Sequence, residues 1–148
     1  MDNLQELYQQ VIIDHGTQPR NFGVLEPCSH HAEGFNPLCG DELMLYLQTE
    51  DDVITDVKFT GQGCAISTAS ASLMSQYLMG KHIDQAKGAM HAFIQMVTER
   101  PDDEYPDLDK LTILAGVNKY PSRVKCATLA WHTLQAALDN ATQPVTTE

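Results

Sequence analysis

Three cysteines and one aspartate have the residue types and settings of a site that binds metal or handles sulfur. Cys39 and Asp41 lie two positions apart in the run Asn36-Pro37-Leu38-Cys39-Gly40-Asp41, so their side chains fall on the same side of an extended chain. Cys64 follows a Gly-Gln-Gly run, and Cys126 follows a lysine. Since these thiols come from distant segments, the tertiary fold must assemble the site, unlike a zinc finger that closes on local Cys-x-x-Cys pairs. We therefore expect a chemical role rather than a purely structural one.

Composition limits the setting in which such a site works. The 148 residues predict a single domain, residues 1–148, with a buried core. Nine basic against twenty acidic residues give a net charge of −11, which argues against nucleic acid or membrane surfaces as partners. No apolar run approaches the roughly 20 residues that span a bilayer, and a signal peptide is not expected. We expect a cytoplasmic protein, whose four cysteines bind metal or do thiol chemistry rather than form disulfides.

Two predicted strands bring the distant thiols toward each other. Alternating leucines over residues 42–48 and β-branched residues over 53–60 predict a hairpin with an acidic turn. An antiparallel pair returns to the end at which it started. Cys39 and Asp41, just before the first strand, should therefore lie near Cys64, just after the second.

Helical periodicity accounts for most of the remaining chain. Cys64 is expected at a helix N-terminus, where free backbone N–H groups and the helix dipole favour thiolate over thiol. Cys126 is expected in the first turns of another helix, which begins at Pro121. The predicted helices cover residues 4–15, 65 to about 80, 83–97 and 121 to about 140.

Three segments are expected to be less regular. Residues 24–35 predict a loop and one edge strand, because Pro27 limits pairing within a sheet. The acidic stretch 99–109 predicts a solvated loop, which could help to dock a basic partner surface. A polar tail from about residue 142 is expected to fray.

Several longer motifs follow one another along nearly the whole chain. They are LYQQVIIDH at 7–15 with PRN at 19–21, NPLCGD at 36–41, GQGCAIS at 61–67 with ASAS at 69–72, and RVKCATLAW at 123–131. Together they resemble the IscU/SufU group of iron-sulfur cluster assembly proteins, and its SufU branch more closely. The resemblance implies an α+β fold of the SufE/IscU-like kind, with a small three-stranded antiparallel sheet packed against helices.

Two departures from housekeeping IscU scaffolds favour the SufU branch. Those scaffolds carry a histidine before the third cysteine, where this chain has Lys125, and the region 87–118 looks longer here. The SufU resemblance implies a zinc-dependent sulfurtransferase that accepts persulfide sulfur from a cysteine desulfurase of the SufS type. It also implies one zinc ion held by Cys39, Asp41, Cys64 and Cys126.

Donor chemistry supports that ligand set in part. Zinc favours four ligands and takes thiolate readily, whereas a carboxylate is a harder and more exchangeable donor. Bound metal keeps thiols deprotonated, and metal loss or ligand exchange frees a nucleophilic sulfur. We hypothesise that Cys39, on a mobile loop beside Gly40, attacks the terminal sulfur of a partner's persulfide while Cys64 and Cys126 hold the zinc.

A second hypothesis is a binding scaffold. A [2Fe-2S] cluster would be assembled on Cys39, Cys64 and Cys126 and passed to other iron-sulfur assembly proteins or client apo-proteins. Asp41 would then be a weak fourth ligand that leaves the cluster labile. The missing histidine before Cys126 makes this iron site less complete. Zinc retained in air favours sulfur transfer, and stable cluster formation with delivery favours the scaffold.

Residues around the site have alternative readings. Arg123 and Lys125 could neutralise the thiolates, could hold Asp41 until a partner displaces it, or could be solvated charges at a helix start. Of the two, the planar guanidinium of Arg123 suits a carboxylate better. Cys28 lacks a motif and is left out of the site. His30 and His31 should point opposite ways along an extended chain, which argues against a joint metal role. The histidines on predicted helices are expected at the surface.

Overall fold

The computed structural model describes residues 3–98, 108, 111, 113–115, 117, 120–140 and 143–146. Within these residues the chain forms four α-helices and four β-strands, arranged as an α+β fold. The helices are α1 (Asn3–Thr17), α2 (Ala65–Leu78), α3 (Ile83–Thr98) and α4 (Pro121–Leu138), and the strands are β1 (His30–Asn36), β2 (Asp41–Glu50), β3 (Val53–Gln62) and β4 (Val145–Thr146). The predicted helices and both strands of the hairpin are present.

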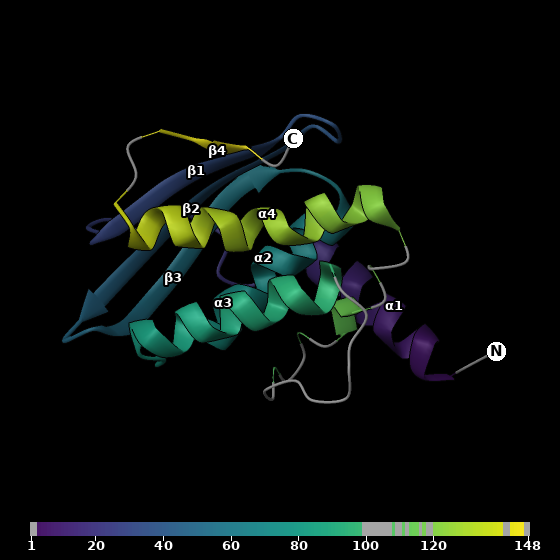
Figure 1. Cartoon of the computed structure of the whole chain (residues 1–148), viewed down its shortest axis with the longest axis horizontal. Helices are drawn as coiled ribbons and strands as arrows, with labels where there is room; N and C mark the ends of the chain where they lie inside the picture. Colours follow the sequence, from purple (N-terminus) through teal and green to yellow (C-terminus); the bar gives the residue numbers. More distant parts are fainter. Residues whose placement is uncertain are drawn as a thin grey trace.

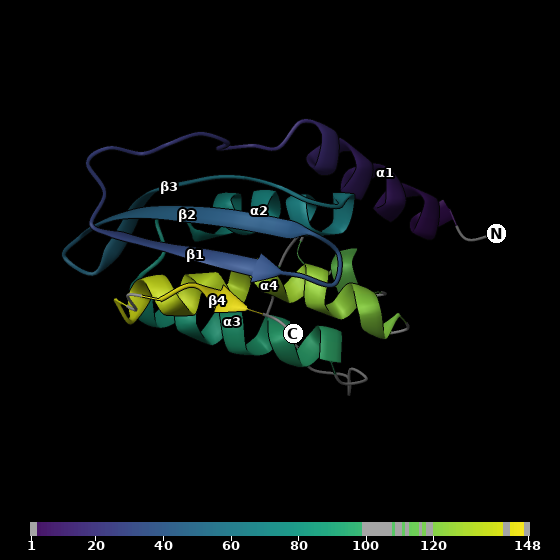
Figure 2. The ribbon, with the colours of Figure 1, turned by 90° about the horizontal axis from the view of Figure 1, so that it is seen from above.

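The sheet has the strand order β3-β2-β1-β4 (Figures 1 and 2). β1 and β2 are antiparallel, as are β2 and β3, whereas β4 runs parallel to β1. Helix α4 packs along β1 and β2, and α2 packs against β3 and α4. Helix α1 contacts α2, and α3 runs alongside α4, as Figure 1 shows. The last helix of the sequence therefore lies in the middle of the packing.

The buried face of the sheet follows the predicted alternation. Leu43, Leu45 and Leu47 on β2 are buried, while Met44 and Tyr46 between them are partly exposed. A strand places successive side chains on opposite faces, so one apolar face meets the helices. The core also contains Trp131 of α4, whose ring stacks on Phe93 of α3 at 4.7 Å between centroids. This stacking holds α4 against α3.

The strand count differs from the expected three. Val145 and Thr146 pair with Gly34 and Phe35 of β1, which makes a fourth strand within the stretch expected to fray. Val145 is half-buried against the core, which accounts for the docking of this short segment. β1 therefore pairs with β2 along one edge and with β4 along the other, so it is not the edge strand that was expected. The acidic stretch 99–109 lies outside the described residues, apart from the buried Leu108.

One helical histidine is buried, contrary to the surface position expected for it. His15 at the end of α1 is 3% exposed, and its Nδ1 lies 2.7 Å from the Ser72 hydroxyl of α2. The same hydroxyl accepts a hydrogen bond from the backbone N–H of Arg20. Close approach is also seen at Gly16, where an added Cβ would lie 3.1 Å from Ala65. Small residues on α2 thus allow α1 to dock beside the start of α2.

None of the described helices combines the length and the apolarity that a membrane crossing requires.

Candidate metal and sulfur site

A four-residue loop between β1 and β2 carries Cys39. Asn36 and Asp41 pair directly across the hairpin, and the Cys39 N–H bonds to the Asn36 carbonyl oxygen at 3.3 Å. Gly40 has φ +71°, a left-handed conformation that glycine adopts without a Cβ clash. Cys39 is exposed, as is its neighbour Leu38 at 65%. The loop therefore presents one thiol at the surface.

The fold brings Cys39, Asp41 and Cys126 together. One ligand atom from each of these residues lies within 4.8 Å of the others, and the sulfur atoms of Cys39 and Cys126 are 3.3 Å apart. Cys126 is fully buried in α4, and Asp41 is 1% exposed. The cluster thus has an outer side, formed by Cys39, and an inner side that solvent does not reach.

Asp41 is held by two hydrogen bonds. Its Oδ1 accepts from the backbone N–H of Cys64 at 2.8 Å, and its Oδ2 accepts from Nδ2 of Asn36 at 3.1 Å. A Cβ at Gly63 would lie 2.5 Å from Oδ1, and Cβ atoms essentially never come within 3.0 Å of such an atom. The absence of a side chain at Gly63 is therefore what lets this carboxylate reach the start of α2.

Cys64 is close to the cluster, but its sulfur does not complete it. The residue is the N-cap of α2, and its Sγ accepts a hydrogen bond from the Ser67 N–H at 3.4 Å. Its sulfur is not among the donor atoms that lie within 4.8 Å of one another in the described part of the chain. It still acts electrostatically on Cys126. The structure thus brings three of the four predicted ligands together and puts the fourth beside them.

Two pKa shifts reflect this crowding. Burial raises the pKa of the Cys126 thiol well above its usual range, and hydrogen bonding to Cys39 and Cys64 and the nearby Asp41 charge act in the same direction. The Cys126 Sγ–H donates toward the Cys39 sulfur at 3.3 Å. A hydrogen bond to Cys126 raises the pKa of Arg123 above its ordinary value, and the neighbouring cysteines add to this effect.

The two predicted supporting cations differ in their contacts. Arg123 is exposed, and its pKa is raised by the side chains of Cys126, Cys64 and Cys39, with no contribution from Asp41. Lys125 is half-buried on α4, and it is in neither of the two ion pairs that join side chains of the described residues, Arg20 with Asp14 and His82 with Asp84. Arg123 is therefore the cation that faces the thiols.

The donor set suits a thiophilic metal. Two thiols and one carboxylate within mutual reach are ligands of zinc or iron, whereas magnesium and calcium take oxygen donors. The side chains of Cys39, Asp41 and Cys126 lie within reach of one ion, and Cys64 lies beside them. The residues present therefore fit a bound zinc ion, and they also fit iron.

Comparison with known proteins decides the family. The family model described as "NifU-like N terminal domain" matches residues 7–143. The chain belongs to this family.

Relatives of this NifU-like domain carry two different functional names. The chain is 44% identical over 133 residues to the zinc-dependent sulfurtransferase SufU of Bacillus subtilis, covering 90% of each chain. It is 37% identical over 138 residues to the iron-sulfur cluster assembly scaffold protein IscU of Streptococcus pyogenes, covering 93% of this chain and 86% of the relative.

A solved structure matches the fold as well. A candidate iron-sulfur cluster assembly scaffold protein for the SUF system of Fervidobacterium islandicum superposes with a TM-score of 0.83 at 36% identity. The match covers 90% of this chain and 98% of that one. The α+β architecture seen here is thus the one found in a solved SUF-system protein.

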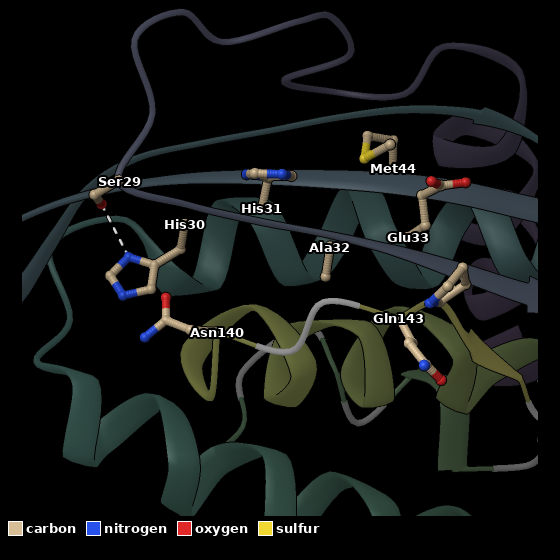
Figure 3. A pocket seen from close by; sticks show the side chains of 9 residues that line it. Ser29, His30, His31, Ala32, Glu33, Met44, Asn140 and Gln143 are labelled. Carbon is tan, nitrogen blue, oxygen red and sulfur yellow. Dashed lines mark hydrogen bonds between the residues drawn. The ribbon is translucent and has the colours of Figure 1, made fainter.

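A separate pocket of the NifU-like domain lies beside β1 (Figure 3). Its volume is about 410 Å³, and none of the cysteines lines it. His30 points toward Asn140, whereas His31 leaves the strand in another direction, as predicted for neighbours on an extended chain. The residues that line it are Ser29, His30, His31, Ala32, Glu33, Met44, Asn140, Gln143 and Pro144. The candidate chemistry therefore lies in the thiol cluster and not in this hollow.

Sequence reasoning did not identify the contacts of two residues of the site, although a glycine at 63 was expected to permit a close approach. Asn36 binds Asp41 and also reaches the Cys126 sulfur at 3.5 Å, and Gly63 makes room for the Asp41 carboxylate. A signal for Asn36 was present, because an amide at the position that pairs with Asp41 across a short hairpin loop can reach that carboxylate. The need for glycine at 63 depends on a contact that the sequence does not reveal.

Proposed function

We propose that this chain is a zinc-bound sulfur acceptor and carrier in iron-sulfur cluster assembly. It takes persulfide sulfur through Cys39 from a cysteine desulfurase of the SufS type. It then passes the sulfur to other assembly proteins or client apo-proteins. Its relation to the zinc-dependent sulfurtransferase SufU supports this proposal. We further propose that it acts as one domain in the cytoplasm, where thiols stay reduced.

The contrast between two touching cysteines carries the proposal. Cys39 is exposed on a loop, and Cys126, whose sulfur is 3.3 Å away, is fully buried. A partner's persulfide can reach Cys39 from solvent but cannot reach Cys126. The exposed Leu38 beside Cys39 offers an apolar contact to a docking partner.

The proposed transfer is a thiol–persulfide exchange. The Cys39 thiolate attacks the terminal sulfur of the persulfide on the partner's cysteine, and a new S–S bond forms at Cys39. The S–S bond of the partner breaks, and its electron pair leaves on the partner's cysteine sulfur, which takes up a proton. No net oxidation or reduction occurs, so no further reagent is needed.

The ligands proposed for zinc are Cys39, Asp41, Cys64 and Cys126. Zinc, when bound, keeps these cysteines as thiolates at neutral pH. Asp41 is oriented by the Cys64 N–H and by Asn36, and Cys126 is held inside the fold. Arg123 lies beside the thiols, where its positive charge offsets their negative charge.

Substitution of Cys39 tests the proposal directly. Wild type, Cys39→Ser and Cys28→Ser are incubated with cysteine and a desulfurase of the SufS type, and sulfur on each cysteine is located by mass spectrometry. Wild type and Cys28→Ser should gain one sulfur atom at residue 39, and Cys39→Ser should gain none. The Cys28→Ser control removes a free thiol outside the donor group. Sulfur uptake by Cys39→Ser at the wild-type rate would refute the assignment.

The scaffold reading has support of its own. IscU relatives are named as cluster assembly scaffold proteins, and the thiols of Cys39, Cys64 and Cys126 could hold iron or a [2Fe-2S] cluster. Native mass spectrometry of protein purified without added metal separates the two functions. One zinc per chain retained in air supports sulfur transfer. Iron and acid-labile sulfide retained together, with transfer to an apo-protein, would support the scaffold instead.

A further inference from the structure

The side chain of Asn36 joins two ligands that come from opposite parts of the chain. We propose that Asn36 is a positioning residue that holds the Asp41 carboxylate and the Cys126 sulfur in place for metal binding. The inference deepens the proposed function and rests on its metal site. It assigns a role to a residue that would not itself coordinate the ion.

The geometry of the amide supports this role. Nδ2 of Asn36 donates to Oδ2 of Asp41 at 3.1 Å and to Sγ of Cys126 at 3.5 Å. An amide nitrogen has two hydrogens, so it can serve both acceptors at once. Asn36 is 0% exposed and ends β1, directly across the hairpin from Asp41. The backbone pairing therefore fixes the point from which the amide donates.

The orientation of the amide is also determined. Turning it over would place Oδ1 against a carboxylate oxygen and a sulfur, which are both acceptors. In the observed orientation, Oδ1 is buried and has no hydrogen-bond partner among the described residues. A buried unpaired acceptor destabilises a fold. Fold stability alone therefore does not account for asparagine here, whereas its two donors do.

The amide acts on the inner ligands of the cluster. Asp41 and a deprotonated Cys126 are both negative, and a donor shared between them offsets their repulsion and fixes their separation. Cys39 receives no hydrogen bond from Asn36 in the described structure. Outer groups that bind metal ligands commonly change metal affinity by about 10- to 100-fold. Asn36 thus holds the two buried ligands, Asp41 and Cys126, and does not restrain the exposed thiol of Cys39.

Cobalt binding tests this role without any desulfurase. The full chain and the variants Asn36→Leu and Asn36→Ala are titrated with Co²⁺, and the thiolate-to-cobalt absorption reports the ligand set. Zinc affinity is then measured by competition with a chelator. Leucine keeps much of the volume of asparagine and lacks the donors. Both variants should bind zinc about 10- to 100-fold more weakly and show shifted cobalt bands.

A matched control separates positioning from general damage. Ser70→Ala removes another buried hydrogen bond near the site, from the Ser70 hydroxyl to the Ala127 carbonyl at 2.6 Å. Thermal unfolding of the metal-free proteins measures how much each change weakens the fold. Ser70→Ala should leave the cobalt bands and the zinc affinity unchanged. Equal loss of affinity in Ser70→Ala and Asn36→Leu would overturn the inference.

A second background tests whether Asn36 acts through its ligands. With Asp41→Ala already present, Asn36→Leu should weaken zinc binding by a clearly smaller factor than in wild type. An undiminished factor, or unchanged affinity and bands for both Asn36 variants, would overturn the inference. Sulfur uptake does not enter these readouts. Failure of the proposed transfer and failure of the Asn36 role are therefore seen separately.

Discussion

The connections of the two hairpins in the sheet differ in length and in role. The β1–β2 loop has four residues, carries the exposed Cys39, and is closed by the buried pair Asn36 and Asp41. The β2–β3 turn consists of Asp51 and Asp52, which are exposed and have φ +52° and +64°. The tight turn reverses the chain with left-handed residues alone. The longer loop places a reactive thiol above a buried polar pair.

The comparison of the two hairpins indicates that metal binding depends on the buried side chains that contact a loop from the interior of the fold. The site loop stands over groups from the start of α2 and from α4, whereas the acidic turn packs over no such cluster in the described structure. Changes beneath the site loop should therefore alter metal binding. Changes in the acidic turn should alter stability alone.

The largest effect is expected beneath the site loop, at Gly63. Gly63→Ala places a methyl group 2.5 Å from Oδ1 of Asp41, so the carboxylate or the start of α2 must move. Zinc affinity should fall at least about tenfold, and overpacking should destabilise the fold by about 1–3 kcal/mol. Chelator competition and thermal unfolding measure the two effects.

Gly88→Ala is the matched control for that substitution. Gly88 is exposed in α3, and an added Cβ would meet no atom within 4 Å. Alanine should stabilise the helix by about 0.5–1 kcal/mol and leave zinc affinity unchanged. Wild-type zinc affinity in Gly63→Ala would show that the position of Asp41 does not govern the site.

A smaller effect is expected within the loop, at Gly40. Its φ of +71° disfavours a side chain, although an added Cβ would meet no atom within 4 Å. Gly40→Ala should destabilise the fold by about 1–2 kcal/mol through backbone strain alone. Gly40→Asn should lose less, because asparagine tolerates the left-handed region. Chemical denaturation checks the order, and equal losses would contradict strain as the cause.

The smallest effect is expected in the acidic turn. Asp52→Gly removes the backbone strain of an aspartate with a positive φ. It also gives the Asp-Gly pair that such two-residue turns prefer. The fold should gain up to about 1 kcal/mol, and sulfur uptake and zinc affinity should stay at wild-type values. A change in zinc affinity would show that the two hairpins are coupled.

Local patterns predicted most of the fold. The alternation of Leu43, Leu45 and Leu47 predicted the strand that became β2, and Pro121 marked the first residue of α4. The paired strands then brought Asp41 beside Cys64, as expected from an antiparallel hairpin. These features depend on neighbours in sequence, which is why they could be predicted.

Features that depend on distant partners could not be predicted. β4 has two residues, too few for a periodic pattern, and it forms because β1 offers a free edge. The burial of His15 depends on Ser72, which lies 57 positions away. The Cys64 sulfur is a local exception, because its contact with the Ser67 N–H depends on side-chain geometry that residue types alone do not determine. The inclusion of Cys64 in the ligand set stays a prediction.

The long span of the contact between Asn36 and Cys126 has a consequence for biogenesis. These residues are 90 positions apart, and Cys126 belongs to α4. While the polypeptide is still being synthesised, β1 and β2 can pair before the thiol of α4 exists, so the early segments offer no complete set of donors. Metal capture is therefore a late event, and occupancy of the site reports that the final helix has docked.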